Sequence, residues 1–336
     1  MKHRNSVILF CLCAMLCIGS ISDINIFTVP TNFPHPEVQP KFNPVSNNGF
    51  LLGKRLFYDS RLSRDGTISC ANCHQQSAAF ANLNTQVSRG IEQRKGTRNT
   101  PALFNLMWQK EFMWDGRQKI LETVPINALT SPSEMDNSME RVLYVLQQDE
   151  AYPRIFEQVY GTKKINQKYV LNALAQFTSM LISADSKYDR VKKKELEFSN
   201  TERVGYLIFR DKCASCHTEP LFTDKGYHNN GLDIAYSDVG RDSLTHNLAD
   251  IGKFRTPSLR NIEITAPYMH DGRFRTLQQV ITHYSSGIKA HKNLDPLLDS
   301  GRNGLKLKTA DQEALISFLK TLTDLNFIND RRFNMN

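Results

Sequence analysis

Two copies of the pattern Cys-x-x-Cys-His carry the most specific chemistry in this chain. Their residues are Cys70, Cys73 and His74 in the first half, and Cys213, Cys216 and His217 in the second. In this pattern the two thiolates add across haem vinyl groups as thioethers, and the adjacent His ligates the iron. The sequence therefore predicts one covalently bound c-type haem in each half of the chain.

A zinc site and a thioredoxin-like redox pair are the alternative uses of such cysteines. Zinc ribbons bring their Cys pairs within ~15–20 residues of each other, whereas Cys73 and Cys213 are separated by most of a domain. Neither alternative requires a His after both pairs. Haem attachment is therefore the favoured interpretation.

The N-terminal residues have the pattern of a secretory signal. Basic residues precede an apolar run from Val7 to Ile18, and small residues follow it. The run is too short to span a bilayer, which takes ~20 residues, so we expect cleavage near Ser22 and a periplasmic protein with no integral membrane segment. Three further cysteines lie in this signal, and lipid attachment to one of them is the less favoured alternative.

The formal net charge of +8 does not indicate nucleic-acid binding. No stripe of Lys and Arg with interleaved aromatic residues stands out. The densest run, Lys192–Lys194, is followed by Glu195 and Glu197, which is typical of a solvated linker. Haem propionates would offset much of the positive charge.

The length of 336 residues allows two domains of ordinary size. Apolar residues recur at helical spacing, for example at Val170, Leu174 and Phe177, so we expect a mainly α fold with two cytochrome c-like domains. The predicted organisation is a signal peptide over 1–22, an extended Pro-rich leader over 23–45, an N-terminal domain over 46–195 and a C-terminal domain over 196–336. Capping boxes are predicted at Ser199–Glu202 and Thr309–Gln312.

An internal repeat links the two halves. Asn99–Asn105 and Met113–Arg117 in the first half match Arg255–Asn261 and Met269–Arg273 in the second, with the same spacing between the paired motifs. Two related domains explain this better than coincidence.

The far side of each predicted haem differs between the halves. No His occurs between Gln75 and Cys216, and the methionines of the first half are better explained as core residues. We therefore expect the first haem to be open to a small oxidant such as hydrogen peroxide. Equal counting along the repeat reaches Ala128 in the first half and Tyr284 in the second, so Tyr284 is a candidate sixth ligand of the second iron.

Several residues remain as alternatives or assistants at these sites. His283 and Met269 compete with Tyr284 for the second iron. Glu134 is a candidate acid/base for peroxide chemistry, with an ordinary surface Glu as its alternative. Trp114 is a candidate relay between the haems, with a buried structural Trp as its alternative.

These residues resemble the bacterial di-haem cytochrome c peroxidases, including the MauG-type enzymes that mature methylamine dehydrogenase. The resemblance covers nearly all of the mature chain. It rests on these motifs: Leu52–Phe57, Asp65–Cys70, Arg98–Pro101, Trp114–Arg117, Phe254–Asn261, Ala266–Arg273 and Leu322–Asp324.

The resemblance implies a peroxidatic N-terminal haem, an electron-transfer C-terminal haem and a calcium ion between them. By position, calcium would be held by the Asn99 side chain and the backbone carbonyls of Thr265 and Pro267, with water completing an oxygen shell. Trp114 matches the inter-haem Trp of the family, and Glu134 matches its catalytic Glu.

The chain departs from the family pattern at three places. The loop Thr85–Gly90 lacks the distal His of many peroxidases, so no reductive activation should be needed. Tyr284 aligns where peroxidases usually have Met and the maturation enzyme has Tyr. Val124 stands where the family usually has a distal Gln.

The resulting hypothesis is a periplasmic cytochrome c peroxidase. It would reduce hydrogen peroxide to water with electrons from a small cytochrome c or cupredoxin. The alternative is a MauG-type enzyme that oxidises a partner protein or an organic substrate. Dimers are common in the family, so a homodimer is one candidate assembly.

Overall fold

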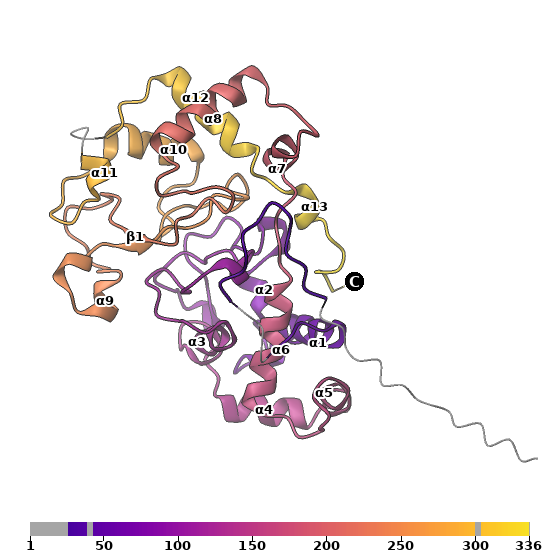
Figure 1. Ribbon diagram of the computed structural model, residues 1–336. Helices are drawn as coiled ribbons and strands as arrows, with labels where there is room; N and C mark the ends of the chain where they lie inside the picture. The colour runs from indigo at the N-terminus through magenta and orange to yellow at the C-terminus, as the bar shows by residue number, and fades with distance from the viewer. Residues whose placement is uncertain (1–25, 39–42, 300–303, 336) are drawn as a thin grey trace, which may run out of the picture.

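The computed structural model describes residues 26–38, 43–299 and 304–335, and it is mainly helical, as predicted (Figure 1). The predicted signal peptide lies outside the described residues. The helices are α1 (Asn47–Tyr58), α2 (Cys70–Cys73), α3 (Val124–Thr130), α4 (Met139–Gln147), α5 (Tyr152–Tyr160), α6 (Gln167–Ser179), α7 (Lys187–Lys192), α8 (Asn200–Lys212), α9 (Asp242–Thr245), α10 (Leu277–Thr282), α11 (Pro296–Asp299), α12 (Thr309–Lys320) and α13 (Leu325–Ile328). Strands β1 (Tyr227–His228) and β2 (Phe254–Arg255) pair antiparallel, with Tyr227 opposite Arg255.

The lower half of the molecule in Figure 1 is built on α1 and α6, which pack against each other. The Ser46 side chain caps α1 by accepting from the Gly49 N–H. Gly53 lets the two helices approach closely, because a Cβ at this position would lie 1.9 Å from the Ala173 carbonyl oxygen. A core of buried apolar side chains, including Phe57 and Phe177, covers this crossing.

The upper half repeats this arrangement with α8 and α12. Gly205 has the same role here as Gly53 has in the lower half, because a Cβ added at Gly205 would lie 1.9 Å from the Ala314 carbonyl oxygen. The predicted capping box at Ser199 is confirmed, with reciprocal bonds between Ser199 and Glu202. The N-termini of α1 and α8 are therefore encoded by local capping residues, and each helix crossing is encoded by a glycine.

The predicted capping box at Thr309 is wrong. Helix α12 begins at Thr309 itself, and Lys308 is the N-cap residue without a side-chain capping bond. The Gln312 side chain instead donates to the Leu307 carbonyl oxygen at 3.0 Å. The helix thus starts one residue earlier than predicted, because Gln312 is used outside the helix.

The two repeats meet at a buried polar junction formed by Asn105, Ser183, Asn261 and Asp324. Both asparagines have a left-handed backbone, with φ of 57° and 58°, which Asn tolerates better than most residues. The Asn105 amide donates to the Ser183 carbonyl at 3.0 Å, and the Asn261 amide donates to the Ser183 hydroxyl at 3.0 Å. Ser183 in turn donates to Asp324 at 3.1 Å, so one residue of the connecting segment ties both halves together.

Segments from both ends of the described chain cross between the halves. Phe33 of the leader is buried against Trp108, and its ring lies 4.7 Å from the guanidinium carbon of Arg260 in the second half. The C-terminal segment leaves α12 and places Phe327 and Phe333 in the core of the first half (Figure 1). Both segments therefore fasten the two halves to each other.

A buried ion pair also links the two halves. Arg260 forms two hydrogen bonds of 2.8 Å to Asp189, and both side chains are fully buried. Asn32 of the leader donates to the same carboxylate at 2.7 Å. Burial by itself would raise the pKa of Asp189, but the bonds from Arg260 hold it below its usual value.

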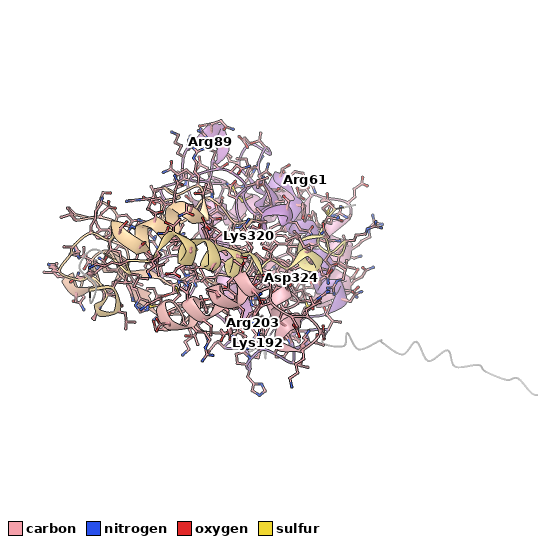
Figure 2. The ribbon with its side chains drawn as sticks, turned by 90° about the horizontal axis from the view of Figure 1, so that it is seen from above. Arg61, Arg89, Lys192, Arg203, Lys320 and Asp324 are labelled. Atoms are coloured by element: carbon pink, nitrogen blue, oxygen red, sulfur yellow. The ribbon has the colours of Figure 1, made fainter. Side chains whose placement is uncertain are left out.

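Several of the basic residues labelled in Figure 2 lie at different edges of the molecule. In the view of Figure 2, Arg89 lies at the upper edge of the molecule and Lys192 at the lower edge, with Arg61 to the right. Among the described residues, no helix is long and apolar enough to cross a membrane.

Replacing Gly205 with Ala should destabilise the protein by about 1–3 kcal/mol, the usual cost of overpacking, because the added methyl group would collide with the Ala314 carbonyl. Thermal unfolding of the haem-loaded protein followed by circular dichroism would measure this. Val204→Ala is the matched control, since Val204 precedes Gly205 on α8 and is 49% exposed. Equal melting temperatures for the two variants would contradict a close crossing at Gly205.

Candidate functional site

The first Cys-x-x-Cys-His motif forms a single helical turn followed by a precisely held histidine ring. Ser69 and Asn72 exchange capping bonds around α2, and the His74 N–H donates to the Cys70 carbonyl at 2.9 Å. The His74 Nδ1–H donates to the Phe80 carbonyl at 2.8 Å, which leaves Nε2 available as a ligand. Burial lowers the pKa of His74 to about 4, so the ring is in the neutral form that binds iron.

The second motif follows α8 directly, and its histidine is also held by a bond from Nδ1 to a backbone carbonyl. The Cys213 N–H donates to the Phe209 carbonyl at 2.8 Å, and the His217 Nδ1–H donates to the Phe222 carbonyl at 3.1 Å. Burial lowers the pKa of His217 as well. Phe80 and Phe222 both have positive φ values, of 60° and 56°, so each motif is followed by a turn that aims a carbonyl at the histidine.

A cavity of about 250 Å³ lies beside the second motif and extends to the first half of the molecule. Residues from the second half that line it include Cys213, Cys216, His217, Leu277, Ile281, Tyr284, Leu315 and Leu319; those from the first half include Asn99, Thr100, Pro101 and Trp114. Two thiols, one neutral imidazole and an apolar wall fit a covalently bound porphyrin. The same cavity therefore brings the second motif close to the predicted relay Trp114.

Tyr284 lines this cavity from the turn that continues helix α10, together with Leu277 and Ile281 of the same helix. The chain continues from Thr282 into a π-helical turn, His283–Gly287, a feature that is frequent at functional sites. The Asn230 side-chain amide donates to Tyr284 Oη at 3.4 Å and to Met269 Sδ at 3.5 Å. The two sequence candidates for the sixth ligand therefore lie around the same amide group.

His283 has a different environment. Its Nε2 atom bonds to the Asn230 carbonyl at 3.0 Å, and its side chain is not among those that line the cavity. Burial lowers its pKa. His283 is thus engaged with the backbone, whereas burial raises the pKa of Tyr284 to about 12 and keeps that phenol protonated.

Trp114 lies where the two repeats exchange hydrogen bonds. The Trp114 Nε1–H donates to the Asn99 carbonyl at 2.8 Å. The Asn99 N–H donates to the His270 carbonyl at 2.7 Å, and the Arg255 N–H donates to the Trp114 carbonyl at 2.8 Å. Asn99 matches Arg255 in the repeat, and Trp114 matches His270. The bond from Asn99 to His270 and the bond from Arg255 to Trp114 therefore join equivalent positions of the two repeats.

The three calcium candidates also line the cavity. Asn99, Thr265 and Pro267 all contribute to its wall. The Asn99 side-chain amide donates to the Gln86 carbonyl at 3.0 Å, which orients the amide. An amide oxygen and backbone carbonyls are the neutral oxygen donors that a hard cation accepts, so these residues fit the ion by donor type.

Glu134 lies near the first motif. Burial raises the pKa of Cys70 to about 12, and the charges of Cys73 and Glu134 add to this increase. The backbone of Glu134 is fixed on both sides, since its carbonyl accepts from the Ile91 N–H at 2.9 Å and its N–H donates to Ser131 at 3.0 Å. Burial raises the pKa of the Glu134 carboxyl, as a proton-transfer group requires.

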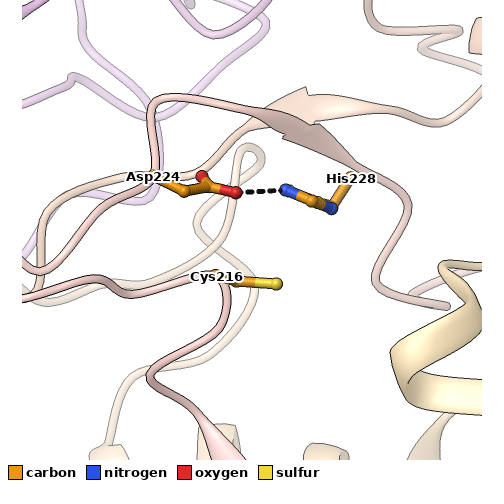
Figure 3. Close-up of side chains that lie close together, drawn as sticks. All are labelled: Cys216, Asp224 and His228. Carbon is orange, nitrogen blue, oxygen red and sulfur yellow. Dashed lines mark hydrogen bonds and ion pairs between the residues drawn. The ribbon is translucent and has the colours of Figure 1, made fainter.

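A histidine that the sequence analysis did not single out lies beside Cys216 (Figure 3). His228 Nε2 bonds to Asp224 at 2.7 Å, and His228 Nδ1 bonds to Asp295 at 2.5 Å. Burial alone would lower the pKa of His228, but these two carboxylates outweigh burial and raise it. Atoms of Cys216, Asp224 and His228 lie within 4.8 Å of one another, yet a Cys216 that carries haem is a thioether and no longer a thiolate ligand.

The mainly helical fold, the internal repeat and the two Cys-x-x-Cys-His motifs define a protein of the c-type cytochrome class. The family model of the di-haem cytochrome c peroxidases matches residues 47–197. The chain is 34% identical over 302 residues to the methylamine utilization protein MauG of Methylorubrum extorquens, covering 88% of this chain and 83% of that protein. It is 32% identical to cytochrome c551 peroxidase of Nitrosomonas europaea, covering 81% and 79% of the two chains.

A solved structure gives the same result. The crystal structure of a MauG-like protein associated with microbial copper homeostasis superposes with a TM-score of 0.85 at 32% identity, covering 91% of this chain and 97% of that one. This protein therefore belongs to the di-haem cytochrome c peroxidase and MauG family of oxidoreductases. Membership implies two c-type haems.

Tyr284→Phe should change the absorption and electron paramagnetic resonance spectra of one haem only, because it removes the phenol oxygen from the cavity of His217. Tyr268→Phe is the matched control, since Tyr268 lines the same cavity but donates its hydroxyl to the Ile262 carbonyl. If Tyr284→Phe leaves both haem spectra unaltered, the sixth position belongs to Met269 or has no protein ligand.

Proposed function

We propose that this protein uses hydrogen peroxide to oxidise a partner protein or organic substrate, in the manner of a MauG-type enzyme. The observation that carries the proposal is the phenol of Tyr284 in the cavity of His217. An anionic oxygen ligand favours the oxidised forms of iron, whereas a Met ligand raises the reduction potential. A second haem with Tyr284 as ligand would therefore store oxidising equivalents better than it would accept electrons from a donor protein.

The first haem, held by Cys70, Cys73 and His74, would supply the iron at which peroxide binds and its O–O bond breaks. Glu134 would move a proton from the iron-side oxygen to the distal oxygen, so that the distal oxygen leaves as water. Its raised pKa supports this role, because a carboxyl group with a higher pKa is both a better base and still protonated closer to neutral pH. Val124 offers no hydrogen bond to the leaving oxygen.

Trp114 would connect the two haem sites. It lines the cavity of the second motif, and its indole N–H is fixed on the Asn99 carbonyl. A side chain with a low ionisation energy at this place shortens each electron step between the domains. The overall balance is one hydrogen peroxide reduced to two waters by two electrons and two protons, both electrons coming from the substrate.

A second candidate function is the reduction of peroxide with electrons from a small cytochrome c or cupredoxin. It is favoured by Met269, whose sulfur shares the Asn230 amide with Tyr284. A His217/Met269 pair of ligands would give a haem of higher potential that accepts electrons from such a donor.

We further propose a structural calcium ion at Asn99, Thr265 and Pro267. All three residues line the cavity that Trp114 also lines, and Asn99 accepts from the Trp114 indole, so the ion would hold the segments that carry the relay. Export to the periplasm is proposed from the signal pattern of residues 1–22, and a homodimer from the habit of the family.

Calcium removal gives a direct test of that site. Prolonged treatment with a chelator should slow peroxide-dependent electron sharing between the haems, because the segments around Trp114 lose a common anchor, and added Ca²⁺ should restore it. Bound metal is counted by elemental analysis. A protein that contains no calcium as purified, and whose haem spectra ignore added Ca²⁺, would contradict the assignment.

The two candidate functions are separated by adding one equivalent of peroxide to the fully oxidised enzyme. The MauG-type hypothesis predicts an oxidised state that decays slowly. A reduced small cytochrome c should barely accelerate this decay. The peroxidase reading predicts rapid, catalytic oxidation of that cytochrome. Stopped-flow absorption distinguishes the two, and Tyr284→Phe should move the protein away from the first behaviour.

Glu134→Gln should retain both haems but slow the reaction with peroxide by about 100-fold, the usual scale for a positioned acid/base group. Glu140→Gln is the matched control, because Glu140 is an exposed carboxylate on the neighbouring helix α4. The rate in the unmodified enzyme should also fall at acidic pH, with a midpoint above that of an ordinary glutamate. A rate unaffected by Glu134→Gln would remove this residue from the mechanism.

A further inference from the structure

Arg255 carries a charge that the protein leaves unbalanced. Its guanidinium donates to the Met113 carbonyl at 3.2 Å and to the Gln109 side-chain oxygen at 2.9 Å, with a longer contact of 3.4 Å to the Thr256 carbonyl. All three acceptors are neutral. Within the part of the chain that the structure describes, no carboxylate forms an ion pair with Arg255.

Other enclosed arginines in this molecule are paired. Arg260 has Asp189 at 2.8 Å, and Arg98 is bonded to both Asp115 and Asp238. Burial lowers the pKa of Arg255, which reflects the cost of enclosing a cation without a counter-charge. An unpaired guanidinium in such a place indicates that an anion from outside the polypeptide completes it.

The carboxylate bonded to the strand partner of Arg255 is already in use. Tyr227, which lies opposite Arg255 in the strand pair, donates its hydroxyl to Glu111 at 2.5 Å. Glu111 also accepts from Arg241 at 2.9 Å. The charge of Glu111 is thus shared by Tyr227 and Arg241. Arg255, which lines the cavity, has no carboxylate partner among the described residues.

Arg255 lies in the wall of the cavity that the second motif shares with Trp114. Its backbone is bonded to Trp114, and two residues further on, Pro257 approaches the ring of His217. Its counterpart in the repeat is the neutral Asn99. Only the second repeat therefore carries a positive charge at this position, and this charge lies in the wall of the cavity that Trp114 also lines.

We propose that Arg255 forms an ion pair with a propionate carboxylate of the haem held by His217. This inference rests on the haem assignment of the second motif, not on which substrate the enzyme oxidises. Cys213 and Cys216 would hold the vinyl edge of that haem, and its propionates, on the opposite edge of the ring, would then lie away from these cysteines. A guanidinium is the side chain best suited to a carboxylate, because its donors match the two oxygens.

The ion pair has two electrostatic consequences. A positive charge close to the second haem favours the reduced iron, so Arg255 raises the reduction potential of that haem. The propionate in turn neutralises a cation that would otherwise oppose the loss of an electron from the adjacent Trp114. Arg255 is thus a positioning residue for electron sharing, acting through the propionate and through the Trp114 backbone.

The test compares Arg255→Gln and Arg255→Lys with the control Arg241→Gln, which removes a nearby cation that already has Glu111 as partner. Haem content is counted by the pyridine haemochrome assay, and the midpoint potentials of both haems are measured by spectroelectrochemistry. We expect two haems in each variant, a lower midpoint potential for one haem in Arg255→Gln, and smaller shifts in Arg255→Lys and Arg241→Gln. The wild-type potentials should not respond to added acetate.

Each result has a distinct meaning. Two haems and unchanged potentials in Arg255→Gln would overturn the ion pair alone, whereas a single haem in the wild-type chain would overturn the proposed function first. Wild-type potentials that follow the acetate concentration would assign the guanidinium to a soluble carboxylate and overturn the propionate. If Arg255→Gln does not accumulate, the propionate bending band in resonance Raman spectra decides: a band shifted in Arg255→Lys supports the pair, and an unshifted band overturns it.

Discussion

The buried polar junction around Ser183 is the constraint on which the arrangement of both halves depends. Asn105 and Asn261 occupy equivalent places in the two repeats and share a left-handed backbone, and both direct their amides to Ser183. Buried amides that lose their partners cost free energy, so the two repeats are held in one relative position. The backbone bonds from Asn99 to His270 and from Arg255 to Trp114 fit that position and no other.

This symmetric frame carries asymmetric side chains. The equivalent bonds at Trp114 and His270 are made by backbone atoms, which any residue supplies, so the side chains were free to diverge. The Trp114 indole donates to the Asn99 carbonyl, whereas the His270 ring stacks on Phe254 with the ring centres 3.7 Å apart. A duplicated domain thus offers two haem positions with one shared scaffold and different chemistry on each side.

The sequence was informative where function needs a fixed spacing. The two Cys-x-x-Cys-His motifs, the repeat and the cap at Ser199 could all be predicted, because each depends on residues close together in the chain. Partners far apart could not. The placing of Asn230 beside Tyr284, the bond between Asp295 and His228, and the return of Phe333 to the first core join residues that no local pattern connects. The cap of α12 failed for a similar reason, since the Gln312 side-chain oxygen that a capping box would use accepts instead from Gln278, 34 residues away in the chain.

Asn230 bears on the choice between the two candidate ligands of the second iron. Its amide reaches both Met269 and Tyr284, but a thioether is a weak acceptor, whereas a hydrogen bond to an anionic oxygen is about twice as strong as one between neutral groups. Coordination of the Tyr284 oxygen to iron would displace its proton and turn its contact with Asn230 into such a charge-assisted bond. The contact of Asn230 with Met269 would gain nothing comparable, so the same amide that stands between the two residues favours the tyrosine.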